Sequence, residues 1–190
     1  MKIESPTNIQ ERPEPWNLDS FRFETVDWSK ARTYEEDALS EVMENDFVVD
    51  GKVFHATLTR SSHEAAEDLA LLLESPSGAH IQADINCMKK PKAKAMLFST
   101  SVSKVDETKE FPKATGIKIY EKLLEYIEHR TNEDGRPSIH IARRETNIVR
   151  EEYQISKDRW NELFVPMFLG RGYSEKQGSP GTWRKKYFPQ

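Results

Sequence analysis

A loop with a lysine at each end and a central glycine is the part of this sequence best suited to chemistry. Lys113-Ala-Thr-Gly-Ile-Lys118 lies between an expected strand, Ala95–Val105, and an expected amphipathic helix, Ile117–His129. The first N–H groups of a helix have no partner within it, and the helix dipole adds partial positive charge there. The loop's N–H groups and its two lysines therefore predict a phosphate site. The alternative is a plain loop in which Gly116 supports a tight turn.

Other residue types that carry out chemistry lack the spacing that they need. Cys87 is the one cysteine of the chain, which excludes an internal disulfide and a multi-cysteine metal site. The five histidines show no metal-ligand spacing with Cys87. The serines near His140 lack the context of a nucleophile elbow. The sequence thus argues against a metal centre and against a serine hydrolase.

Clusters of basic residues indicate a second kind of ligand. The clusters are Lys89–Lys94, Arg143-Arg144 and Arg184-Lys-Lys186. Such clusters can contact the phosphates of a nucleic acid, and Trp183 and Tyr187, beside the last cluster, can stack on bases. The alternative is a set of solvated strand edges, where lysine discourages aggregation.

The elements that must position these residues follow from hydrophobic periodicity and from glycine, proline and serine breaks. The expected strands are Phe21–Val26, Val53–Thr59, Ala79–Asn86, Ala95–Val105, Ser138–Ala142 and a closing hairpin of Gly172–Lys176 with Thr182–Phe188. The expected helices are Tyr34–Asn45, a segment from Ser61 through Leu73, Ile117–His129 and Trp160–Phe168. This pattern predicts a mixed α/β (α+β) fold with a mostly sequential sheet.

Charge divides the 190-residue chain into two halves. Residues 1–88 contain 7 Lys and Arg against 18 Asp and Glu, whereas residues 89–190 contain 21 against 14. A basic half suits an anionic ligand such as a nucleotide cofactor or a nucleic acid, and an acidic half suits a cationic substrate. The alternatives are that the two halves attract each other, or that the acidic half is solvated surface.

The length fits one domain with an extension. We expect a flexible N-terminal segment at 1–18, an N-terminal extension packed on the domain at 19–52, and the domain itself at 53–190. No apolar run approaches the roughly 20 residues that span a bilayer, and the N-terminus lacks the apolar region of a signal peptide. These observations predict a cytoplasmic protein without a membrane partner.

From about residue 53 onward, the order of expected elements resembles the GNAT superfamily of N-acetyltransferases. Residues 113–118 lie where that family has its acyl-CoA loop, Arg/Gln-x-x-Gly-x-Gly/Ala: Lys113 takes the basic position, Gly116 matches the first glycine, and Lys118 replaces the final small residue. Val53–Ser75 looks like the family's opening strand and helix, and Phe168–Tyr173 resembles its segment ending in Leu-Gly-Phe/Tyr. The resemblance covers roughly two-thirds of the chain and implies a mostly antiparallel central sheet flanked by helices.

The resemblance also implies an activity, acyl transfer from acetyl-CoA to an amine substrate. The implied pyrophosphate contacts are Lys113, Ala114, Thr115, Gly116, Ile117 and Lys118, and the implied contacts of the pantetheine arm are Val102 and Val105. Amine acetylation needs a base and an acid, for which we expect Glu107 and Tyr173, with Asp84 and Tyr153 as alternatives. An inactive member that holds nucleic acid or an acidic protein, and assembly as a homodimer, stay open.

Overall fold

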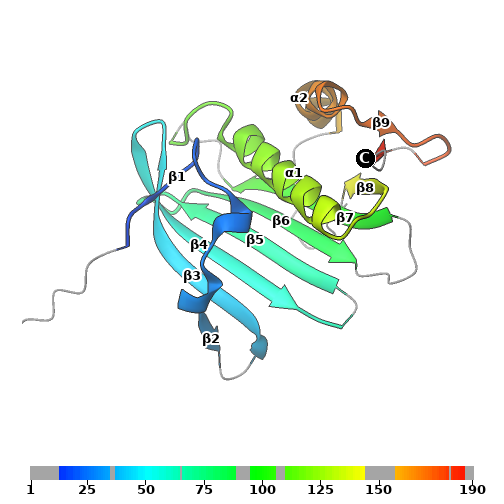
Figure 1. Ribbon diagram of the computed structural model, residues 1–190. Helices are drawn as coiled ribbons and strands as arrows, with labels where there is room; N and C mark the ends of the chain where they lie inside the picture. Colours follow the sequence, from blue (N-terminus) through cyan, green and yellow to red (C-terminus); the bar gives the residue numbers. More distant parts are fainter. Residues whose placement is uncertain are drawn as a thin grey trace, which may run out of the picture.

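The computed structural model describes residues 13–34, 37–64, 66–88, 95–105, 110–143, 157–179 and 181–186. In these residues, strands of one mixed sheet and two α-helices form an α+β fold (Figure 1). The strands are β1 (Trp16–Asn17), β2 (Arg32–Tyr34), β3 (Asp37–Val49), β4 (Lys52–Ser62), β5 (Ala66–Glu74), β6 (His80–Met88), β7 (Ala95–Val105), β8 (Ser138–Arg143), β9 (Ser174–Glu175) and β10 (Thr182–Lys186). The helices are α1 (Thr115–Glu133) and α2 (Lys157–Gly170), with short 3₁₀ turns η1 (Phe23–Thr25) and η2 (Trp28–Lys30).

The sheet order is β1-β3-β4-β5-β6-β7-β8-β10-β9, with β2 also paired to β3. β3 to β7 form consecutive antiparallel pairs, which hairpin connections allow. β8 returns parallel to β7 after the crossover helix α1. β10 then pairs antiparallel with β8 and lies between β8 and β9. The sheet is therefore mixed and mostly antiparallel, as the resemblance implies, and its order is mostly sequential, as the residue pattern predicts.

Both described helices lie on the same face of the sheet (Figure 1). α1 buries one stripe against the sheet, consisting of Ile119, Tyr120, Leu123, Leu124 and Ile127. α2 buries Phe164 and Phe168, and Phe168 stacks on Trp183 of β10 with ring centroids 4.9 Å apart. The expectation of helices flanking the sheet is thus met on one face of the described structure only.

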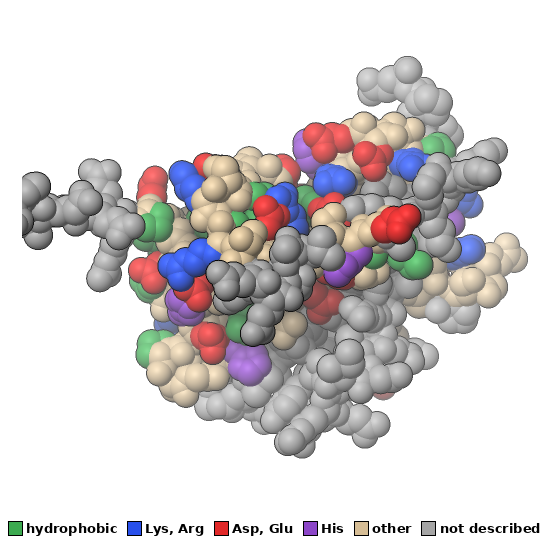
Figure 2. Space-filling view, turned by 90° about the horizontal axis from the view of Figure 1, so that it is seen from below, with side chains coloured by type: hydrophobic (Ala, Val, Ile, Leu, Met, Phe, Trp, Pro, Cys, Tyr) green, Lys and Arg blue, Asp and Glu red, His purple; other side chains and the backbone are tan. Residues whose placement is uncertain are grey.

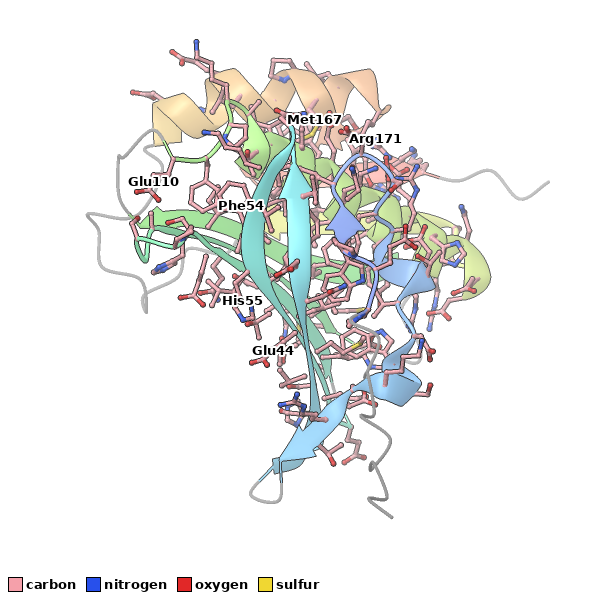
Figure 3. All side chains as sticks on the ribbon, turned by 90° about the vertical axis from the view of Figure 1, so that its left-hand side faces the viewer. Glu44, Phe54, His55, Glu110, Met167 and Arg171 are labelled. Atoms are coloured by element: carbon pink, nitrogen blue, oxygen red, sulfur yellow. The ribbon has the colours of Figure 1, made fainter. Side chains whose placement is uncertain are left out.

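Strand alternation leaves the opposite face of the sheet polar. In β4, the side chains of Phe54, Ala56 and Leu58 are buried, whereas His55 is exposed. Figure 3 shows Phe54 on the side of the helices and His55, with Glu44 of β3, on the other side. Seen from below, acidic, basic and histidine side chains are mixed over this face rather than gathered by type (Figure 2). We call it the outer face.

Three expected elements are wrong. The segment Tyr34–Asn45, expected as a helix, lies largely in β3, and the segment ending at Leu73 forms β5 rather than a helix. Phe21–Val26 contains the 3₁₀ turn η1 instead of a strand. Consequently Val53–Ser75, which resembled a strand followed by a helix, is the β4–β5 hairpin.

The other expected elements are confirmed with small shifts of their ends. Val53–Thr59, Ala95–Val105 and Ser138–Ala142 fall within β4, β7 and β8, and Ala79–Asn86 begins one residue before β6. The two later helices are α1 and α2. The expected domain boundary at 52/53 falls at the β3–β4 hairpin, where Val49 pairs with Lys52. Within the described chain, no helix is long and apolar enough to cross a membrane.

Candidate functional site

The loop before α1 is fixed to the neighbouring hairpin turns. Phe111 stacks on Phe54 with ring centroids 4.6 Å apart and an interplanar angle of 13°. Lys52 Nζ donates to the Glu110 carbonyl oxygen at 3.2 Å, and Ser77 Oγ donates to the Glu110 carboxylate. Figure 3 shows Phe54 and Glu110 at the same end of the sheet. The start of α1 is therefore held in one place by packing and by polar contacts.

Ala114 takes the left-handed conformation at this turn, with a φ of 63°. The alternative prediction was that Gly116 supports a tight turn. In the structure Gly116 is instead the second residue of α1. The Thr115 N–H and Oγ1 both donate to the Pro112 carbonyl oxygen, at 3.3 and 2.8 Å. These two hydrogen bonds close the turn at Thr115, one residue before Gly116.

α1 begins without a side-chain cap. The first helical hydrogen bond joins the Lys118 N–H to the Ala114 carbonyl oxygen at 2.9 Å, and within the described residues the N–H groups of Gly116 and Ile117 have no acceptor. Helix-start N–H groups favour an anion. Lys113 is exposed beside them, so this end of α1 can accept a phosphate group.

Lys118 forms an ion pair with the β3–β4 turn. Its Nζ lies 2.9 Å from an Asp50 carboxylate oxygen and 3.9 Å from one of Asp19. The hydrogen bond with Asp50 raises the pKa of Lys118. Lys118 therefore stays protonated and holds α1 to the β3–β4 hairpin. Lys113, the other lysine of this loop, makes no ion pair with the described residues.

β7 is longer than its partner β8. The two strands pair in parallel from Ala95 with Ser138 to Thr100 with Arg143, whereas β7 pairs with β6 as far as Val105 with His80. Residues 101–105, which include Val102, thus have a sheet partner on the β6 side alone among the residues described. An unpaired strand edge offers N–H and C=O groups to an extended ligand.

Of the two expected proton carriers, the structure describes Tyr173, which lies away from the start of α1. Tyr173 is buried on the helix side, where its ring packs on Phe168 and lies 5.4 Å from Lys185 Nζ. Lys185 also bonds Glu128, which follows Gly116 by twelve residues in α1, or about 18 Å of helix. Glu107 and the alternative Tyr153 lie outside the described residues. The alternative Asp84 lies in β6 opposite Ser101 of β7.

A polar cluster missed by the sequence reasoning lies between α1 and the sheet. Tyr126 Oη donates to Glu67 Oε1 at 3.0 Å, and Arg130 Nη2 lies 3.5 Å from Glu67 Oε2. Burial raises the pKa of Tyr126 well above its ordinary value, so the phenol stays protonated. Cys87 is buried beside this cluster. The i,i+4 spacing of Tyr126 and Arg130 was a sequence signal, but the strand assignment of Glu67 was needed to complete it.

The third basic cluster of the sequence is divided by strand alternation. Lys185 Nζ is 3.2 Å from Glu128 on the helix side, and Trp183 is buried on that side against Phe168. Arg184 and Lys186 face the opposite way and line a concavity. Trp183 is therefore not placed to stack on bases. Tyr187, Lys89–Lys94 and Arg144 lie outside the described residues.

Comparison with protein-family models, with curated proteins and with solved structures finds no match for this chain. The described residues also contain no group of three or more His, Cys, Asp or Glu side chains able to hold a metal ion. The function must therefore be argued from the geometry itself.

Proposed function

We propose that the protein is an acyl-CoA-dependent N-acyltransferase that transfers an acetyl group from acetyl-CoA to an amine. The observation that supports this function most is the pairing of β7. Its last five residues extend beyond β8 with one edge unpaired in the described structure, and α1 follows on the same strand's C-terminal side. A strand edge and a helix start are suited to the two parts of coenzyme A.

The pantetheine arm contains amide groups and matches the unpaired edge of β7. It would bind as an added strand, with backbone hydrogen bonds at residues 102–105. The pyrophosphate would meet the N–H groups of Gly116 and Ile117 and the ammonium of Lys113. Apart from the Lys113 ammonium, these contacts use backbone groups that the described fold leaves without partners.

The sheet order adds support from the fold. A strand, a crossover helix and a parallel strand, followed by a second helix and a hairpin, match the order that the GNAT resemblance implies for residues 95–186. The helix that was wrongly expected before Leu73 belongs to the β4–β5 hairpin and lies outside residues 95–186. The resemblance therefore depends on the C-terminal half of the chain.

Acyl transfer needs two proton movements. A base removes a proton from the ammonium of the acceptor, the amine nitrogen attacks the thioester carbonyl, and the C–S bond breaks to release a thiolate that takes up a proton. Glu107 follows β7 by two residues in the chain, and we assign it the role of the base. Tyr173 is buried beside α2 and Lys185, so we propose that solvent protonates the thiolate.

Isothermal titration with acetyl-CoA tests the binding step. We expect saturable heat and a rise in Tm, because a ligand that binds only the native state stabilises it. Lys113→Glu should weaken binding at least tenfold by placing a carboxylate at the helix start. Lys30→Glu, the same charge change at an exposed residue of η2, is the matched control. The absence of both heat and stabilisation at high acetyl-CoA concentration would refute the proposal.

The chemical step is tested separately, by release of free thiol in the presence of a panel of amines. Glu107→Gln should lower the rate without weakening the binding of acetyl-CoA. If the wild-type chain binds acetyl-CoA but releases no thiol with any amine, the scaffold is a binding module and not an enzyme.

A further inference from the structure

A basic concavity lies on the outer face at the β9–β10 end of the sheet, far from β4 in the sheet order. It has a volume of about 600 Å³. Its lining consists of Gly172, Ser174, Glu175, Lys176, Gln177, Arg184 and Lys186. A volume of this size is in the range that holds small molecules.

The charge of the basic concavity is positive. Lys176, Arg184 and Lys186 make no ion pair with the described residues. The one acidic side chain of the lining is Glu175. It accepts a hydrogen bond from the Gly181 N–H at 2.8 Å and so stabilises the β9–β10 turn. Three positive side chains and one carboxylate give the lining a net charge of about +2, which an anionic ligand can neutralise.

Two buried nitrogen atoms at this place lack hydrogen-bond partners in the described structure. They are Arg184 Nε and Nε2 of His140, the residue directly opposite Arg184 on β8. A buried polar atom without a partner costs about 1–3 kcal/mol, and native proteins seldom leave one unused. Arg184 lines the concavity, so its Nε is hydrogen-bonding capacity left unused beside the charges, and His140 Nε2 lies on the neighbouring strand.

We propose that the basic concavity binds a phosphate-bearing small molecule. A phosphate monoester has close to two negative charges at neutral pH, which matches the excess of two cations better than one carboxylate does. The arginine guanidinium contacts phosphate in a fixed fork geometry, and the two lysines add mobile donors.

A nucleic acid fits this place less well. Single-stranded nucleic acid is held by aromatic side chains on which the bases stack, and none of the residues that line the concavity is aromatic. Tyr173 and Trp183, the described aromatic residues next to the lining in sequence, are both buried against Phe168 on the helix side. The phosphate-bearing ligand therefore is small and bound mainly through its charged group.

The test is a titration of the full chain with inorganic phosphate, followed by NMR chemical shifts, with sodium chloride at equal ionic strength as the baseline. Arg184→Gln combined with Lys186→Gln should weaken binding at least tenfold. Lys185→Gln is the matched control for Arg184→Gln alone, because each removes one charge from β10, on opposite faces, and Lys185→Gln leaves Glu128 its bond with Arg171. The control should bind phosphate as the wild type does.

A second pair of variants separates this site from the proposed acetyl-CoA site. Lys113→Gln should leave phosphate binding at the concavity intact, as judged by the resonances of His140 and Gln177. If instead Lys113→Gln abolishes binding and Arg184→Gln does not, phosphate binds at α1 and the inference is wrong. Equal loss in Arg184→Gln and Lys185→Gln, acetate binding as tightly as phosphate, or a single-stranded oligonucleotide binding far more tightly would each overturn it as well.

Discussion

The protonation of His140 is opposed both by its burial and by its charged neighbours. Burial lowers the pKa of His140 below its ordinary value of 6.5, and the positive charges of Arg184 and Lys176 lower it further. The imidazole is therefore neutral at pH 7 beside two cations. Its neutrality keeps the net charge of the basic concavity from rising further.

The lowered pKa of His140 predicts a pH-dependent stability. Between the lowered pKa of the folded state and the pKa of the unfolded state, near 6.5, the unfolded chain binds more protons, so stability falls as the pH drops through this interval. Urea unfolding at several pH values should show this fall, and His140→Gln should reduce it. His55→Gln, at an exposed histidine of the outer face, is the control; a wild-type slope in His140→Gln would contradict the assignment.

At the scale of elements, the two wrong helices show why periodicity alone was not sufficient. The β5 sequence Ala-Glu-Asp-Leu-Ala-Leu-Leu-Leu-Glu is rich in helix-forming residues, and Leu69, Leu72 and Leu73 fit a helical stripe. In the structure Leu69, Leu71 and Leu73 are buried and Leu72 lies on the other face. Pairing with β4 and β6 overrides the local preference.

The elements around the candidate site were predictable for a physical reason. α1 shows an uninterrupted spacing of three and four over Tyr120, Leu123, Leu124 and Ile127, which a strand cannot satisfy. The start of α1 was predicted, but the left-handed residue was not, because Ala114 has no sequence signal for positive φ. The basic concavity was not predictable either, since it depends on which residues of β10 share a face with Lys176.

Because β5 is a strand, Leu71 should contribute more to stability than Leu72. A helix over the same residues would reverse that order. Leu71→Ala should lower the free energy of unfolding by about 2–5 kcal/mol, because the side chain is almost fully buried. Leu72→Ala, the same change at the neighbouring half-buried residue, should cost less than half as much. Chemical denaturation of both variants measures this, and a larger loss for Leu72→Ala would support the helix instead.

At the scale of the whole molecule, the acidic and basic halves are joined through α1. Ion pairs cross between residues 1–88 and 89–190 at Lys118 with Asp50, Arg130 with Glu67, and Arg22 with Glu125. Each involves α1, which lies over the central strands of the sheet (Figure 1). Lys118 with Asp50 and Arg130 with Glu67 join a cation of the basic half to an anion of the acidic half, whereas Arg22 with Glu125 has the reverse arrangement. The division of charge thus accounts for two of these three attractions between the halves.

The continuous sheet predicts that the chain unfolds as one unit. β3, within the expected N-terminal extension, pairs with β4 over ten residue pairs, so residues 19–52 should not unfold separately. Two single-tryptophan variants, one keeping Trp28 and the other Trp183, would report the two ends of the sheet. Their fluorescence should give the same urea midpoint; an earlier midpoint for Trp28 would show that the extension is an independent unit.

The short strands at the two ends of the sheet order have a consequence for solubility. β1 and β9, which end the described sheet, have two residues each, whereas the inner strands β3 to β7 have nine to thirteen. A long exposed edge invites another chain to add a strand, and a two-residue edge offers almost nothing to copy. β1 covers Phe47 and Val48 of β3, and β2 covers a second part of the same edge around Glu41, so the long β3 edge is left open only in short stretches. This interruption contributes to solubility out of proportion to the few hydrogen bonds that the short strands make.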